Sequence, residues 1–161
     1  MHFGNLQRTE LVGIVSSVLL VISIFLPWFE LADTAERTNQ GAWICGEGVY
    51  SCDAWATFPI GRWLFLAAAA APVILAYFIV REAKGKYPTG EFTMTVGFIV
   101  IVLVIFNGIL QKPGESIDQI GISLDYGYWM ALAAGVLMAA AGAFRSVEQG
   151  GGAGRRPPGT F

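Results

Sequence analysis

The sequence predicts an all-α protein, a transmembrane four-helix bundle with both termini in the cytoplasm and a longer, disulfide-closed first outer loop. Four stretches carry no formal charge and are strongly apolar, at 11–29, 63–80, 92–110 and 127–144. Each is long enough to cross a bilayer as a helix. The mean hydropathy is high, at +0.57, and the basic residues are distributed unequally among the connecting segments.

One membrane domain, 1–145, accounts for almost the whole chain of 161 residues. The predicted spans leave outer loops at 30–62 and 111–126. The remaining segment, 146–161, is rich in glycine and proline and is predicted to be a disordered cytoplasmic tail.

The charges predict the orientation, because Lys and Arg are retained on the cytoplasmic side during insertion. Seven of the ten basic residues lie before the first span, between the second and third, or after the fourth: Arg8, Arg81, Lys84, Lys86, Arg145, Arg155 and Arg156. The other two loops carry most of the acids: Glu30, Asp33, Glu36, Glu47, Asp53, Glu115, Asp118 and Asp125. We expect a multi-pass protein of the plasma membrane with its acidic loops outside.

The first helix is expected to begin near Thr9, which can cap it, and to end where proline and aromatic residues follow at 27–29. Its three serines, Ser16, Ser17 and Ser23, should hydrogen-bond to the backbone of their own helix. The second helix contains an alanine run followed by Pro72, which predicts a kink facing a neighbouring helix.

The third helix is bulky on every side, and Asn107 is its one strongly polar residue. The fourth helix has small residues every four positions: Ala131, Gly135, Ala139 and Ala143. Such a seam predicts close contact with another helix. We expect the second helix as its partner, and a homo-oligomer through Ala131, Gly135 and Ala139 is the alternative.

Both cysteines, Cys45 and Cys52, lie in the first outer loop, with six residues between them. A structural disulfide is expected in an oxidising compartment. Free thiols and a redox or metal-binding pair are the alternatives, but redox sites normally use the Cys-x-x-Cys spacing.

All five tryptophans lie on the outer side of the predicted topology. Trp28, Trp63 and Trp129 are at span ends, where interfacial anchoring is expected. Trp43 and Trp55 flank the cysteines, and they either pack the loop onto the helix ends or form a surface for a partner.

The order of Trp28, the Gly41-Ala42-Trp43 motif, Cys45, Cys52 and Arg62 resembles the claudin and peripheral myelin protein group. That resemblance implies four helices with both termini inside, and Trp28, Trp43 and Arg62 clustered beneath the disulfide. In that cluster the two indoles would sandwich the guanidinium.

A second resemblance covers most of the chain. The segments 25–29, 53–58 and 121–127, followed by an Ala/Gly-rich last span, are similar to uncharacterised small four-span proteins of actinobacterial type. This resemblance implies a bacterial plasma membrane and no particular activity.

Ionisable residues are absent from the span centres, and the single histidine, His2, is terminal. We therefore expect no catalytic site, no cofactor or metal, and no nucleic-acid partner. The leading hypothesis is a non-enzymatic interaction or accessory subunit of the cell envelope. It would meet lipid or an envelope protein through Trp28, Trp43, Trp55 and Arg62. A transporter or channel-like subunit for a neutral or apolar solute, with Pro72 and Asn107 lining the path, is the alternative; a membrane enzyme comes third.

Overall fold

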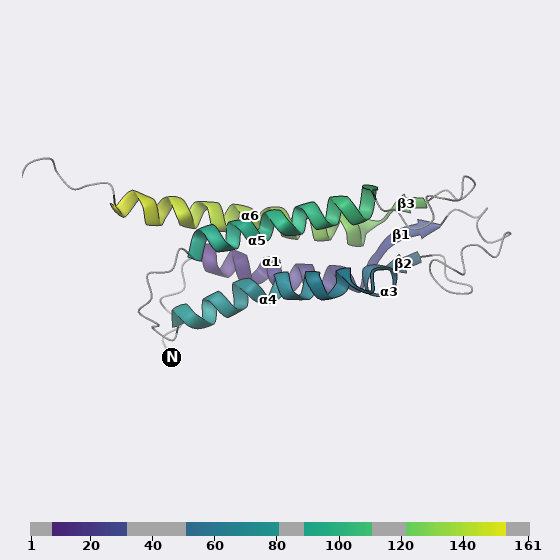
Figure 1. Ribbon diagram of the computed structural model, residues 1–161, viewed down its shortest axis with the longest axis horizontal. Coiled ribbons are helices and arrows are strands. Elements are labelled where there is room, and N and C mark those ends of the chain that lie inside the picture. The colour runs from purple at the N-terminus through teal and green to yellow at the C-terminus, as the bar shows by residue number, and fades with distance from the viewer. Residues whose placement is uncertain (1–7, 32–50, 81–88, 111–121, 154–161) are drawn as a thin grey trace, which may run out of the picture.

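The computed structural model describes residues 8–31, 51–80, 89–110 and 122–153. Four long helices lie along one axis, with a small sheet at one end of the bundle (Figure 1). The helices are α1 (Arg8–Ile24), α4 (Gly61–Val80), α5 (Thr89–Ile105) and α6 (Tyr126–Ala153). We call the end that carries the strands the sheet end. The first turn of α1 and the last turns of α6 lie at the other end.

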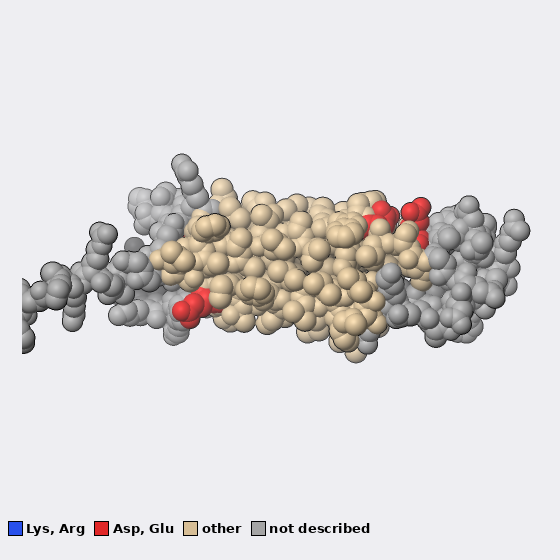
Figure 2. Space-filling view, turned by 90° about the horizontal axis from the view of Figure 1, so that it is seen from above, with Lys and Arg blue, Asp and Glu red and all other residues tan. Residues whose placement is uncertain are grey.

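Three helical segments are long and apolar enough to cross a membrane: Gly61–Phe78, Gly90–Leu110 and Tyr126–Val147. Figure 2 shows one face of the described residues as an uncharged belt, with acidic side chains only toward the ends. The helices also expose large apolar side chains such as Phe98 and Val102 of α5, which water would solvate poorly. Length and composition together indicate a small multi-span membrane protein.

The first predicted span, 11–29, is wrong at its outer end, because α1 stops at Ile24. A turn follows, in which the backbone N–H of Leu26 donates to the carbonyl of Ser23. Pro27 lacks the N–H that a continuing helix would need, and it opens the strand β1 (Pro27–Leu31). At 17 residues, Arg8–Ile24 is shorter than the three span-length segments.

The predicted all-α fold is corrected by a three-stranded antiparallel sheet. Its order is β2-β1-β3, with β2 at Ser51–Asp53 and β3 at Ile122–Leu124. Phe29 pairs with Cys52 on one side and with Leu124 on the other. The central strand therefore joins segments from both loops that were predicted to lie outside the membrane.

The sheet leads directly into helices. Asp53 caps the short helix α3 (Ala54–Thr57), since its Oδ1 accepts a hydrogen bond of 2.8 Å from the N–H of Ala56. After β3, the N–H of Asp125 donates to the carbonyl of Trp28 at 2.8 Å, and α6 begins at the next residue.

Helix α6 continues past Arg145 to Ala153, so 146–153 is helical where a disordered tail was predicted.

Cys52 is buried on β2 and is not a free cysteine. Its expected partner, Cys45, lies outside the described residues, as do Trp43 and the rest of 32–50, so that disulfide stays a prediction.

The small residues of α6 pack against α5, and not against α4, which was the predicted partner. A Cβ on Gly97 of α5 would meet the backbone N of Ala139 and lie 2.7 Å from its Cα, and one on Gly135 would lie 3.0 Å from Val100. These distances mean that backbones touch, as in small-residue seams of membrane helices. Ala131, Gly135 and Ala139 are buried within the chain, so the alternative, a homo-oligomer through them, gains no support.

Candidate functional site

The sheet end is built around an aromatic cluster of buried or half-buried rings: Trp28, Phe29, Phe58, Phe65 and Tyr128. Trp28 is fully buried, and its ring lies 5.4 Å from Phe65, 5.8 Å from Phe58 and 5.9 Å from Tyr128, centroid to centroid. These separations are those of tilted and edge-to-face aromatic pairs. The cluster therefore ties β1 to the start of α4 and the start of α6.

Trp28 was predicted to be an interfacial anchor, and its burial corrects that assignment. Its Nε1–H donates a 2.7 Å hydrogen bond to the carbonyl of Ser23, which also accepts from the backbone N–H of Leu26 in the turn after α1. Trp63 and Trp129 are 59% and 57% exposed, and their anchoring at the membrane interface stays a prediction.

Arg62 lies over two indole rings at the sheet end. Its Cζ is 4.9 Å from the ring centroid of Trp55 and 5.8 Å from that of Trp63, both within cation–π range. Trp55 is itself stacked on Phe25 at 5.3 Å. We call Arg62, Trp55 and Trp63 the arginine platform.

The platform corrects the sandwich implied by the claudin resemblance. Trp28 packs against the rings of Phe58 and Phe65. Within the described residues, the guanidinium of Arg62 contacts Trp55 and Trp63 instead. The other indole of that sandwich, Trp43, falls outside the described residues.

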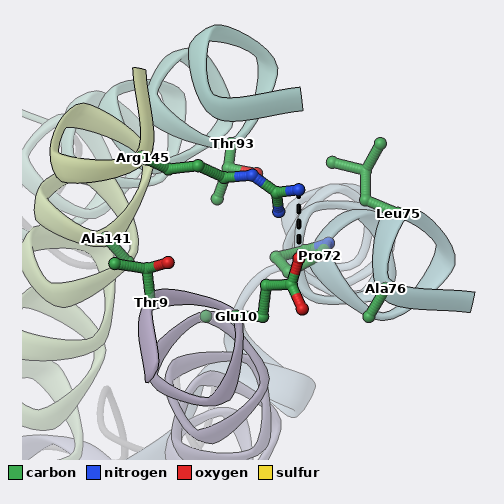
Figure 3. A pocket seen from close by; sticks show the side chains of 10 residues that line it. Thr9, Glu10, Pro72, Leu75, Ala76, Thr93, Ala141 and Arg145 are labelled. Carbon is green, nitrogen blue, oxygen red and sulfur yellow. Dashed lines mark ion pairs between the residues drawn. The ribbon is translucent and has the colours of Figure 1, made fainter. Parts of the chain in front are cut away.

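The opposite end of the bundle contains an ion pair that the sequence analysis did not identify. Arg145 of α6 reaches across to Glu10 of α1, with 3.0 Å between Nη2 and Oε1 (Figure 3). The side chains are only 12% and 3% exposed. A charge pair so buried joins α1 to α6 and is costly to break.

A cavity of about 20 Å³ adjoins this pair. All four long helices contribute to its lining: Thr9, Glu10, Gly13, Pro72, Leu75, Ala76, Thr93, Ala141, Gly142 and Arg145. Such a volume holds about one water molecule. Thr9 Oγ1 and Arg145 Nε are buried without a hydrogen-bond partner, so polar groups remain for a water to bridge.

Pro72 and Asn107, predicted to line one path, lie far apart. Pro72 is buried inside α4 and lines the cavity beside the ion pair. Thr93 is the residue of α5 that lines the same cavity. Asn107 follows Thr93 by 14 residues, or about 21 Å of helix. It lies in the π-helical turn η3 (Phe106–Leu110), and its Nδ2 donates to the carbonyl of Leu103 at 2.8 Å.

The prediction for the serines is confirmed. The hydroxyls of Ser16, Ser17 and Ser23 donate to the carbonyls of Val12, Gly13 and Leu20 of their own helix. Within the described part of the chain, no three His, Cys, Asp or Glu side chains gather where they could hold a metal ion.

The missed ion pair had a weak signal in the sequence. Glu10 and Arg145 lie just outside the first and last apolar stretches, on the same predicted side of the membrane. Arg145 is fully explained by the charge rule for topology, so nothing in the sequence assigns it to Glu10.

Comparison of the chain with protein-family models, with curated proteins and with solved structures finds no match. The fold and the composition therefore define a class, the small multi-span membrane protein, and identify no family within it. The two resemblances noted in the sequence gain no support from these comparisons.

Proposed function

We propose that this chain is a non-enzymatic plasma-membrane protein that works as an interaction or accessory subunit of the cell envelope through its sheet end. The proposal rests on the contrast at the sheet end between buried aromatic residues and the exposed apolar residues around them. A buried aromatic cluster holds three strands on the helices, and around it Ile60, Trp63, Tyr126 and Trp129 are all more than half exposed. Fixed, exposed aromatic residues are typical of recognition surfaces.

Several other described polar side chains have structural partners. The buried serine hydroxyls bond to their own helix, and Glu10 pairs with Arg145. These contacts support a role in binding over a role in catalysis.

The proposal includes four spans with both termini in the cytoplasm. Helix α1 is 17 residues long, which is about 26 Å, close to the hydrocarbon thickness of a bilayer. The ion pair from Glu10 to Arg145 brings the start of α1 and the end of the last span to one side. The predicted disulfide between Cys45 and Cys52 would close the loop that enters β2.

Single cysteines test this topology in a background where Cys45 and Cys52 are serines. We expect Ser123→Cys, exposed on β3, to react with a membrane-impermeant maleimide from outside intact cells. Val147→Cys, 71% exposed at the other end, should react only after permeabilisation. The reverse labelling pattern would contradict the orientation and would move the sheet end to the cytoplasm.

Site-specific photo-cross-linking tests the role of the sheet end. Benzoylphenylalanine at Ile60, which is 76% exposed, should give a discrete protein adduct in native membranes. The matched control is Val102, 62% exposed on α5 in the apolar belt, where only lipid adducts are expected. Indistinguishable adducts from the two positions would remove the support for a partner at the sheet end.

A second candidate is a transporter or channel-like subunit for a neutral or apolar solute. It is favoured by an apolar groove of about 370 Å³ between α1 and α4, lined by Ser17, Val18, Val21, Ile22, Leu66, Ala69, Ala70, Val73 and Ile74. Flux of such a solute into liposomes containing only this protein would favour this candidate over the first.

A further inference from the structure

We propose that the arginine platform binds the phosphate group of a membrane lipid in the leaflet at the sheet end, with Arg62 as the binding residue. This inference does not depend on the proposed function, since a lipid could occupy the site whether or not a protein partner exists. It rests on the depth of Arg62, on the fact that no described carboxylate forms an ion pair with it, and on the apolar surface beside it.

The depth of Arg62 follows from the length of α4. The span-length segment Gly61–Phe78 has 18 residues and is about 27 Å long, close to the roughly 30 Å of the hydrocarbon core. Arg62 is its second residue. A helix of this length that fills the hydrocarbon core places Arg62 at the boundary between hydrocarbon and headgroups, where lipid phosphates lie.

The charge of Arg62 is uncompensated among the residues that the structure describes. The ion pair found there joins Arg145 to Glu10, at the other end of the bundle. A guanidinium has five N–H donors. Arg62 makes one long hydrogen bond, 3.4 Å from Nη1 to the carbonyl of Trp55, and its Nε is buried without a partner. A permanent cation at a membrane boundary is stabilised by an anion.

The platform also fixes the cation before any ligand arrives. Trp55 and Trp63 lie within cation–π distance of Cζ, and Trp55 is held by Phe25. A planar guanidinium that is already positioned can donate two parallel hydrogen bonds to a phosphate, at a reduced cost in side-chain entropy.

The neighbouring surface favours a lipid over a free phosphate ion. Ile60 is 76% exposed and Trp63 is 59% exposed, so apolar surface for an acyl chain adjoins the cation. Glu30, Asp53 and Asp125 lie on or beside the strands of the same end and oppose any anion, so the apolar contact of an acyl chain is the attraction that a free phosphate ion lacks. A lipid phosphate reaches Arg62 from within the membrane.

The test measures lipid binding to the purified full chain in detergent by native mass spectrometry. Phosphatidylglycerol is compared with monogalactosyl diacylglycerol of identical acyl chains, which has no phosphate. We expect the wild-type chain to bind phosphatidylglycerol at least about tenfold more tightly, and Arg62→Gln to remove about that factor, because hydrogen bonds to charged groups are the strong ones. Arg62→Lys should lose part of it. Arg81→Gln, which removes the same charge just after the span 63–80, should change little.

Several results would overturn the proposal. Equal binding of the two lipids by the wild-type chain would do so without any variant, and it decides the matter even if Arg62→Gln fails to fold. An unchanged affinity in Arg62→Gln, checked by circular dichroism to be folded, would place the lipid elsewhere. Displacement of the lipid by inorganic phosphate at an equal concentration would assign the site to a soluble anion.

Discussion

Replacing Glu10 by leucine is expected to lower the free energy of unfolding by about 3 to 5 kcal/mol. The substitution leaves Arg145, only 12% exposed, without its carboxylate at 3.0 Å. Arg145 Nε already lacks a hydrogen-bond partner, so its burial is tolerated only because Glu10 neutralises the charge. Unfolding of the protein in mixed micelles, followed by circular dichroism as dodecyl sulfate is added, measures the loss.

The double variant Glu10→Leu with Arg145→Met is the matched control. It removes both charges and keeps the volume apolar, so we expect it to recover most of the stability lost in the single variant. If the double variant is as unstable as Glu10→Leu alone, the packing of Glu10 matters more than its charge. If the single variant is as stable as the wild-type chain, the ion pair does not join α1 to α6.

Replacing Gly97 by alanine is expected to cost about 3 kcal/mol or more, at the upper end of what overpacking costs. The added Cβ would lie 2.7 Å from the Cα of Ala139 and would also clash with that residue's backbone N. Backbone atoms of a helix cannot rotate away as a flexible side chain can, so α5 and α6 must separate along their seam. The same dodecyl sulfate titration measures the loss.

Gly13→Ala is the matched control, because it makes the same change on another apolar helix, α1. Its Cβ would meet only Pro72 Cβ at 3.7 Å, an ordinary contact. We expect stability to be unchanged or to rise by up to about 1 kcal/mol, since alanine is the better helix former. Equal destabilisation by the two substitutions would show that loss of glycine itself, and not the seam between α5 and α6, is responsible.

The local features of this protein could be predicted from its sequence alone. The second, third and fourth apolar stretches predicted the three span-length segments, because helix formation in a membrane depends on a continuous apolar run. The hydrogen bonds of Ser16, Ser17 and Ser23 were also predictable, since each joins groups three or four residues apart on one helix.

Contacts between groups far apart in the sequence could not be predicted, because they depend on how the whole chain packs. β2 and β3 have three residues each, too few for a strand pattern, and both form by pairing with β1. Trp28 looked like an anchor because its position at the end of an apolar stretch suits a membrane interface. Its burial depends on Phe58, Phe65 and Tyr128, which arrive from other parts of the chain.

The seam between α5 and α6 and the surroundings of Arg62 and Arg145 also depend on contacts between distant parts of the chain. A small-residue repeat on α6 predicts close packing with some helix, and the sequence cannot say that the partner is α5, where Gly97 faces Ala139. Arg62 and Arg145 are equally compatible with topology signals. Their different environments, indole rings for one and a buried carboxylate for the other, follow from contacts between helices and not from local sequence.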